Sequence, residues 1–290
     1  MNLQNILNEL EKVDGDAIER LGHVSRRHVF QNLLKKAVIG GTAAAPVAFG
    51  SLLNKAYGDH LTVVYDVLNF ALALEYLEAE FYNRGLAMAG LIRSEDRRIF
   101  EQIAKHENAH VALLRSALGS FAAPKPTFDF TARGAFPTVF SDYNTFKAVA
   151  QAFEDTGVRA YKGQAPRLLP FPDVLTTALQ IHSVEARHAA RVRYLRGMDD
   201  GVMVNDSGMQ VMQQGWITRN ESGGLPGAIY AGEENVMQAG VDVTMLVNNV
   251  SLGMGMGTGI SRDNVTEAFD EPLTKEQVLA IVSPFIASGM

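Results

Sequence analysis

The segment IAKHENAH, Ile103–His110, places a glutamate and a histidine three residues apart, at Glu107 and His110, in a run of helix-forming residues. Side chains three positions apart lie on the same face of an α-helix, so these two point in one direction. Burying glutamate or histidine costs free energy unless the side chain is paired or bound to something. The segment therefore predicts a helix with a polar inward face, whose partners come from elsewhere in the chain.

A second Glu-x-x-His pair, Glu185 and His188, lies in the segment HSVEARHAA. The interval from Glu107 to Glu185 equals the interval from His110 to His188, because the spacing within both pairs is the same. One such pair arises easily by chance, so the evidence lies in the repetition. A second pair far along the chain raises the question of an internal repeat.

The repeat extends to a glutamate and a tyrosine that precede each pair. Glu75 is followed seven residues later by Tyr82, and Glu154 is followed seven residues later by Tyr161. The interval that separates these two glutamates differs by a single position from the interval that separates the two Glu-x-x-His pairs. The sequence therefore predicts two pseudo-symmetric helical hairpins, with the glutamate and tyrosine on the first helix and Glu-x-x-His on the second.

Apolar residues near 3.6-residue spacing predict four long helices, over residues 60–88, 94–118, 141–161 and 172–196. Short links join the first two helices and the last two, whereas residues 120–140 form a long connection. Two hairpins joined by one long crossover are typical of the ferritin-like topology. We therefore expect an all-α fold, a ferritin-like four-helix bundle.

Serines and glycines predict where these helices begin and end. Ser94 and Ser141 are expected to start the second and third helices as N-caps. Gly119 is expected to stop the second helix, and Gly163 and Gly197 are expected to follow the ends of the third and fourth.

The chain is expected to have three parts: an N-terminal segment (1–58), the bundle (59–200) and a loop-rich C-terminal extension (201–290). In the extension, SLGMGMGTG (251–259) lacks the GK[ST] ending of a phosphate-binding loop, which favours a flexible or packing loop. PLTKEQVLAIVSPF (272–285) predicts a final helix, in which Thr274 and Gln277 form a capping box. We expect the extension to pack on the bundle or to assemble it.

The N-terminal segment contains SRRHVF, Ser25–Phe30, followed by the apolar run AVIGGTAAAPVAF, Ala37–Phe49. The run is short for a membrane span but suits the apolar region of an export signal behind basic residues. It resembles a twin-arginine signal and predicts export to the periplasm. The alternative is an ordinary N-terminal helix of a cytoplasmic protein.

Composition excludes several kinds of site. The 290 residues include no cysteine, which excludes disulfides, thiolate metal sites and iron–sulfur clusters. The net charge of −6 gives no indication of nucleic-acid binding. We expect no transmembrane helix, and the acidic, Gly-rich extension leaves room for a homodimer.

If the two hairpins pack together, their carboxylates and imidazoles meet inside the bundle. Such ligands suit iron or manganese, and bridging glutamates can hold two ions about 3.5–4 Å apart. Without a cation, the buried carboxylates would repel one another. The sequence thus predicts a centre of two iron or manganese ions; the alternative is a set of buried ion pairs with Arg84, Arg159 or Arg187.

The six residues resemble the ligand set of ferritin-like di-iron and di-manganese carboxylate proteins. The segments LNFALALEYLEAEFY and PLTKEQVLAIVSPF are similar to the ferritin-like family that includes plant and bacterial desiccation-related proteins. The resemblance implies one terminal glutamate per ion, two bridging glutamates and one histidine per ion. The terminal ligands would be Glu75 and Glu154, and the bridging ligands Glu107 and Glu185. His110 and His188 would be the histidine ligands.

Four further residues lie near the predicted ligands. We expect Glu78 to join a polar network or the surface, with an extra metal ligand as the alternative. Tyr82 and Tyr161 are expected to pack against the ligands, with hydrogen bonds to the ligands or a redox role as the alternatives. His182 is expected to bond a neighbouring carboxylate on its helix, although it could reach the site.

The function expected from this resemblance is redox chemistry of two iron or manganese ions with dioxygen or peroxide, of a ferroxidase, peroxidase or catalase kind. The alternative is a non-catalytic stress- or desiccation-related protein that binds metal or has a structural role in the cell envelope. A third interpretation is a metal-free scaffold. The ligand types do not distinguish iron from manganese.

Overall fold

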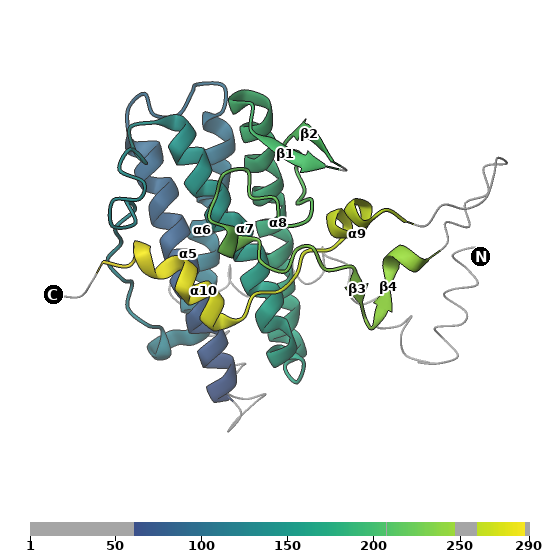
Figure 1. Ribbon diagram of the computed structural model, residues 1–290. Helices are drawn as coiled ribbons and strands as arrows, with labels where there is room; N and C mark the ends of the chain where they lie inside the picture. Colours follow the sequence, from purple (N-terminus) through teal and green to yellow (C-terminus); the bar gives the residue numbers. More distant parts are fainter. Residues whose placement is uncertain (1–60, 207, 247–259, 288–290) are drawn as a thin grey trace, which may run out of the picture.

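Four long helices form a bundle in the computed structural model, which describes residues 61–206, 208–246 and 260–287 (Figure 1). The helices α5 and α6 form one hairpin and α7 and α8 form the other. The prediction of an all-α, ferritin-like bundle is confirmed. The helices are α5 (Leu61–Ala87), α6 (Arg97–Leu118), α7 (Tyr143–Gln164) and α8 (Pro172–Asp200).

The long connection between the hairpins is present as predicted. It follows α6 with a short 3-10 helix, η2 (Gly119–Phe121), and reaches the start of α7 through turns and loops. It buries Phe128 and Phe130 against the bundle. Phe128 also forms an antiparallel bridge with Ile286, so the connection contacts the last described residues of the chain.

Two of the predicted helix starts are wrong by one or two residues. The N-cap of α6 is Asp96 rather than Ser94, and its side chain makes no capping hydrogen bond. The N-cap of α7 is Asp142 rather than Ser141, and its carboxylate accepts a hydrogen bond from the Thr145 amide at 2.7 Å. Gly119 does end α6, with a φ of 55° that favours glycine.

The prediction that Gly163 and Gly197 follow helix ends is also wrong, because both lie inside their helices. A Cβ at Gly163 would collide with the Leu273 carbonyl oxygen, and one at Gly197 would collide with the Gln213 carbonyl oxygen. Glycine is needed at these positions because the backbone of the extension crosses the helices there. The α8 helix ends instead at Gly201, which has the left-handed conformation.

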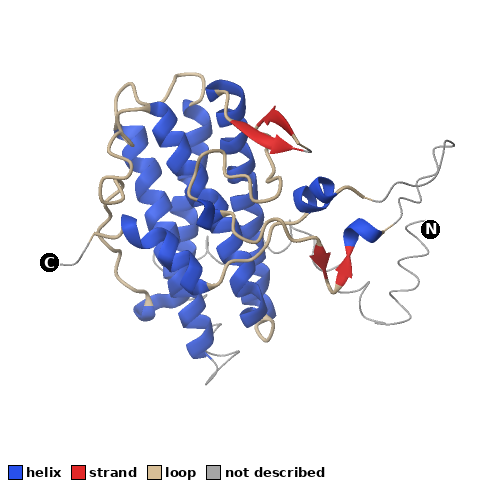
Figure 2. Ribbon diagram, viewed as in Figure 1, coloured by secondary structure: helices blue, strands red, loops and turns tan. Residues whose placement is uncertain are grey.

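The extension contains short elements that lie along one side of the bundle (Figures 1 and 2). Within the described residues it holds the only strands, two antiparallel pairs. Its helix α10 begins with the predicted capping box of Thr274 and Gln277. The elements are β1 (Met203–Asp206), β2 (Met209–Met212), η4 (Gly227–Ile229), β3 (Met237–Gln238), β4 (Val241–Asp242), η5 (Val243–Met245), α9 (Arg262–Ala268), α10 (Lys275–Val282) and η6 (Ser283–Phe285).

Buried polar contacts attach the extension to α7. The Arg159 guanidinium donates hydrogen bonds to the carbonyl oxygens of Ala231 and Glu271 at 2.6 and 2.7 Å, and it pairs with Glu233 at 2.8 Å. The Tyr230 hydroxyl donates a 2.6 Å hydrogen bond to Asp155. These contacts fix the outer face of the second hairpin.

Two features predicted from sequence, the export signal and the Gly/Met-rich loop at 251–259, lie outside the described residues. Among the helices that the structure describes, none combines the length and the hydropathy that crossing a membrane would require.

Candidate metal centre

The bundle brings all six predicted ligands to its interior. The glutamates have no exposed surface, and His110 and His188 are 8% and 5% exposed. Each of the four helices contributes, because each carries its ligands on the face that meets the other helices. Glu75 comes from α5, Glu107 and His110 from α6, Glu154 from α7, and Glu185 and His188 from α8.

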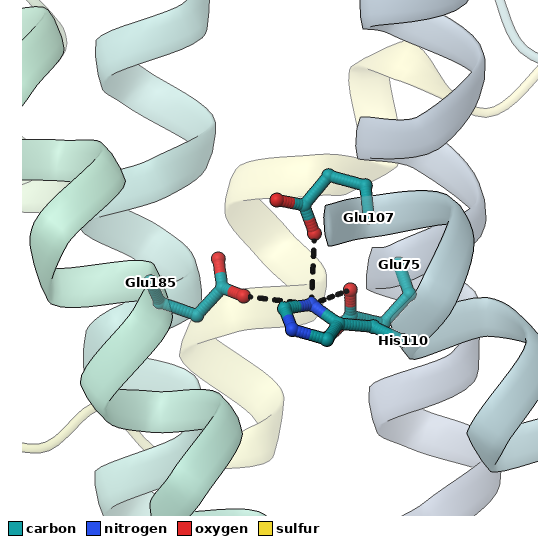
Figure 3. A group of neighbouring side chains, drawn as sticks. All are labelled: Glu75, Glu107, His110 and Glu185. Atoms are coloured by element: carbon teal, nitrogen blue, oxygen red, sulfur yellow. Dashed lines mark hydrogen bonds and ion pairs between the residues drawn. The ribbon is translucent and has the colours of Figure 1, made fainter. Parts of the chain in front are cut away.

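The first group consists of Glu75, Glu107, His110 and Glu185 (Figure 3). The His110 Nδ1 atom lies 3.1 Å from Glu75, 3.0 Å from Glu107 and 3.2 Å from Glu185, measured to carboxylate oxygens. One atom from each of the four residues lies within 4.8 Å of the others. Side chains from three helices thus converge on one position.

The second group consists of Glu107, Glu154, Glu185 and His188, with the same 4.8 Å limit. The His188 Nδ1 atom lies 2.8 Å from Glu107 Oε1 and 3.3 Å from Glu154 Oε2. The two groups share Glu107 and Glu185. Glu107 directs Oε2 toward His110 and Oε1 toward His188, so its carboxylate spans both groups.

Several buried polar atoms of the two groups have no hydrogen bond of regular geometry to a described residue, and the close neighbours that some of them have are ion-pair partners within the groups. The buried atoms are Glu107 Oε1, Glu154 Oε2, both carboxylate oxygens of Glu185 and His188 Nδ1. Buried polar atoms nearly always have partners, so a set of such atoms in one place requires an explanation. Cations coordinated between the two groups would satisfy them, and the donor set of carboxylate oxygen and imidazole nitrogen is one that iron and manganese accept.

Glu75, Glu154 and Glu185 resist ionisation when no cation is present. Burial raises the pKa of Glu75 to about 7, with a further contribution from the charge of Glu107. Burial and the charges of Glu107 and Glu75 hold the pKa of Glu185 well above its usual range. Burial also raises the pKa of Glu154. A neutralising partner would therefore favour the ionised forms of these three side chains.

His110, His188 and Glu107, in contrast, favour their charged forms. Burial opposes protonation of His188, but the charge of Glu154 and hydrogen bonding to Glu107 outweigh it and raise the pKa of His188 to about 11. The carboxylates around His110 raise its pKa as well, against the effect of burial. Burial opposes ionisation of Glu107, yet hydrogen bonds from His110 and His188 lower its pKa to about 2. Protonated imidazoles thus stand where cations would bind.

Two tyrosines orient the glutamates that are not shared. The Tyr161 hydroxyl donates a 2.5 Å hydrogen bond to Glu75 Oε1, and the Tyr82 hydroxyl donates one of the same length to Glu154 Oε1. Each bond joins one hairpin to the other. Burial, together with the neighbouring carboxylate, holds the pKa of each tyrosine well above its usual range, so both remain protonated donors.

Glu78 lies inside the bundle, which excludes the surface position and leaves the other expectation, a polar network. It is 3% exposed, and its carboxylate joins the other glutamates. A Cβ atom on Gly157 would lie 3.2 Å from Glu78 Oε1 and 3.3 Å from Glu185 Oε2, so the glycine leaves room for both. Burial, followed by the charge of Glu185, holds the pKa of Glu78 well above its usual range. Glu78 follows Glu75 by three residues, and Gly157 follows Glu154 by three, so Gly157 occupies the position that matches Glu78 in the repeat. A glycine at this position is the sequence feature that indicates room for a buried Glu78.

Two further histidines differ in their relation to the centre. His106 Nδ1 lies 2.8 Å from His188 Nε2, and the two rings stack. His106 therefore orients the His188 ring, whose Nδ1 atom points toward the glutamates. His182 belongs to neither group, and its buried Nε2 has no hydrogen-bond partner among the described residues.

The alternative of buried ion pairs with arginine is not observed for two of its three candidates. Arg84 pairs with Glu80 on its own helix. Arg159 pairs with Glu233 of the extension. The guanidinium groups thus have other carboxylate partners.

Comparison with known proteins bears on this arrangement. Residues 64–198 match the family model described as the ferritin-like domain. That range contains both groups and nearly the whole of the four helices. A search of curated proteins found no match to the chain.

Proposed function

Because the chain carries a ferritin-like domain over residues 64–198, we propose that it binds two iron or manganese ions and uses them in redox chemistry with dioxygen or peroxide. The observation that carries the proposal is the pair of groups that share Glu107 and Glu185. Their buried carboxylate oxygens and imidazole nitrogen lack hydrogen bonds of regular geometry to other described residues and form a donor set that fits these metals.

Each ligand has a defined part in the proposal. Glu107 and Glu185 would bridge the ions, and Glu75 and Glu154 would each bind one. His110 would complete the first position through Nδ1, and His188 would complete the second. When bound, two divalent ions would supply one electron each, and dioxygen that accepts these electrons with two protons leaves as hydrogen peroxide.

The chain's own residues would prepare the site in three ways. Burial of the glutamates excludes bulk water, which strengthens electrostatic interactions with a cation. Tyr161 and Tyr82 hold one oxygen of Glu75 and of Glu154, which leaves the second oxygen of each directed at its group. Each group also brings together only four side chains, fewer than an octahedral ion accepts, so a reactant can bind.

The first test is elemental analysis of the purified chain, after anaerobic supply of ferrous or manganous ions. We expect about two ions per chain, as a dinuclear site requires. The variant Glu107→Ala/His110→Ala should lose them, whereas Glu101→Ala/Lys105→Ala, on the exposed face of the same helix, should retain them. Circular dichroism checks that all three proteins are folded. Absence of metal from the reconstituted wild-type chain would overturn the proposal.

A second test separates catalysis from mere binding. The metal-loaded chain is mixed with dioxygen or with hydrogen peroxide, and oxidant consumption is followed over many equivalents. Sustained consumption that is lost in Glu107→Ala/His110→Ala supports oxidoreduction. Full metal content without consumption would favour the non-catalytic alternative, a stress-related protein that binds metal or has a structural role.

We also propose that the chain is exported, on the basis of the SRRHVF motif and the apolar run that follows it. Mass spectrometry of the N-terminus after cell fractionation tests this. A processed chain in the periplasm is expected, and an intact Met1 in the cytoplasm would contradict the proposal.

A further inference from the structure

We propose that an apolar cavity inside the bundle delivers dioxygen, rather than hydrogen peroxide, to the first group. This inference rests on the proposed function and identifies its oxidant. The cavity lies between all four helices, and its volume is about 20 Å³.

The cavity begins one helical turn from three ligands. Its walls include Ala71, Leu114 and Ile181, which stand four residues from Glu75, His110 and Glu185, respectively. Tyr161 also lines it, and the hydroxyl of this tyrosine bonds Glu75. Glu75 and His110 belong to the first group alone and Glu185 is shared, so the cavity lies on the side of the first group.

The size of the cavity limits what it can hold. A water-sized molecule needs about 10–15 Å³ on this scale, so 20 Å³ accommodates one small molecule and excludes an acyl chain or an aromatic ring. Dioxygen, a diatomic, fits this limit.

The walls also select against a polar occupant. The surface that the cavity exposes is almost entirely apolar. Of its polar lining residues, Thr177 donates its hydroxyl to the Asp173 carbonyl and Gln164 accepts from Arg167. Hydrogen peroxide would lose its hydrogen bonds to water on entry, whereas dioxygen has none to lose.

Comparison of the two repeats shows that, within the described residues, the cavity has no counterpart at the matching position near Tyr82. Beside Tyr82, the repeat-related space is filled by buried rings of Phe81, Phe100 and Phe146, with Phe81 and Phe146 stacked at 4.7 Å. The counterparts of these rings, taken at the intervals that relate the predicted ligands, are small and line the cavity. They are Ala160 for Phe81, Ala178 for Phe100 and Val67 for Phe146.

A hollow of this kind costs stability, because its walls lose packing contacts on one side. At the matching positions near Tyr82, the same bundle holds three phenylalanine rings without such a hollow. The small residues therefore keep open a space that the repeat could have closed.

The test uses full-length chain and two readouts. Crystals under xenon pressure report whether an apolar gas enters the cavity. Stopped-flow mixing of metal-loaded protein with dioxygen, and separately with hydrogen peroxide, reports the oxidation rate. The variants are Ala178→Phe, which installs the repeat-related ring, and the smaller change Ala178→Val. The control is Phe100→Leu, at the matched position in the filled half.

We expect xenon in the wild-type cavity and none in Ala178→Phe. With metal content unchanged, oxidation by dioxygen should slow at least about tenfold in Ala178→Phe and less in Ala178→Val, while oxidation by peroxide stays within about twofold. Phe100→Leu should match the wild type with both oxidants. If Ala178→Phe does not fold, the xenon result and the graded rate of Ala178→Val decide.

Two outcomes would overturn the inference while the proposed function stands. One is a wild-type cavity without xenon. The other is an unchanged dioxygen rate in a metal-loaded variant that has lost xenon. A wild-type chain that takes up no metal would instead overturn the proposed function, and this inference with it.

Discussion

Tyr161 and Tyr82 each reach from one hairpin to a glutamate of the other, so one hydroxyl affects both packing and ligand orientation. In Tyr161→Phe, Glu75 loses its 2.5 Å hydrogen bond, and we expect affinity for one of two ions to fall about 10–100-fold. Metal titration with a competing chelator measures this. Tyr82→Phe should weaken the other ion through Glu154.

Tyr143→Phe is the matched control for the tyrosine prediction, because the Tyr143 hydroxyl bonds Asp96 rather than a predicted ligand. It should leave both affinities unchanged. Equal titration curves for Tyr161→Phe and the wild type would show that this hydroxyl does not position Glu75.

The variant Gly157→Ala tests how closely the carboxylates of Glu78 and Glu185 are packed. In Gly157→Ala, the new methyl group would lie 3.2 Å from Glu78 Oε1 and 3.3 Å from Glu185 Oε2, so at least one carboxylate must move. Alanine favours a helix over glycine by about 1 kcal/mol. We therefore expect metal content to fall while the thermal stability of the metal-free chain holds or rises. A parallel fall in both quantities would indicate a packing defect instead.

The six candidate ligands could be predicted because each has a counterpart in the repeat. Glu78 has no such counterpart, since Gly157 occupies the matching position. Residue spacing alone places Glu78 on the face of Glu75 but does not show how much room the facing helix leaves. That information comes only from the packed pair of α5 and α7.

At the scale of elements, the helices themselves were predictable from apolar periodicity, but some of their ends were not. Glycine in a helical pattern indicates either a stop or a close approach of backbone. For Gly163 the approaching group is the Leu273 carbonyl, which comes from the far end of the chain. The sequence around residue 163 therefore cannot predict this contact.

Gly163→Ala distinguishes these two meanings of a helical glycine. Helix propensity alone predicts a gain of about 1 kcal/mol. The clash with the Leu273 carbonyl should outweigh it and give a net loss of about 1–3 kcal/mol in the free energy of unfolding, measured with urea. Gly197→Ala should behave alike, whereas Lys105→Ala, on an exposed position of α6, should change little. A stabilised Gly163→Ala chain would show that the extension does not lie against α7.

For the whole molecule, the candidate centre predicts opposite responses to pH with and without metal. Glu75 has a pKa of about 7 and His188 one of about 11, both above the unfolded values of 4.5 and 6.5. At these two side chains, the metal-free folded state thus holds more protons than the unfolded state between about pH 4.5 and 11. Its stability should fall as pH rises, by about 1.4 kcal/mol per pH unit for each extra proton.

Metal binding should reverse this trend, because an imidazole must lose its proton to coordinate a cation. Apparent affinity should rise about tenfold per pH unit for each displaced proton, and stabilisation by metal rises with it. Melting temperatures at about pH 5.5 and 8.5, with and without metal, measure both trends. A higher melting temperature of the metal-free chain at about pH 8.5 than at about pH 5.5 would contradict the prediction that Glu75 and His188 hold protons in the folded state.

The order of the polypeptide gives the attachment of the extension a consequence for biosynthesis. When a ribosome has made residue 200, every candidate ligand already exists, but the carbonyl groups that receive Arg159 do not. The Arg159 guanidinium, which is made as part of α7, therefore gains these acceptors only after Ala231 and Glu271 have been synthesised. The hydrogen bonding of α7 is thus completed only after Glu271 has been synthesised, 112 residues after Arg159.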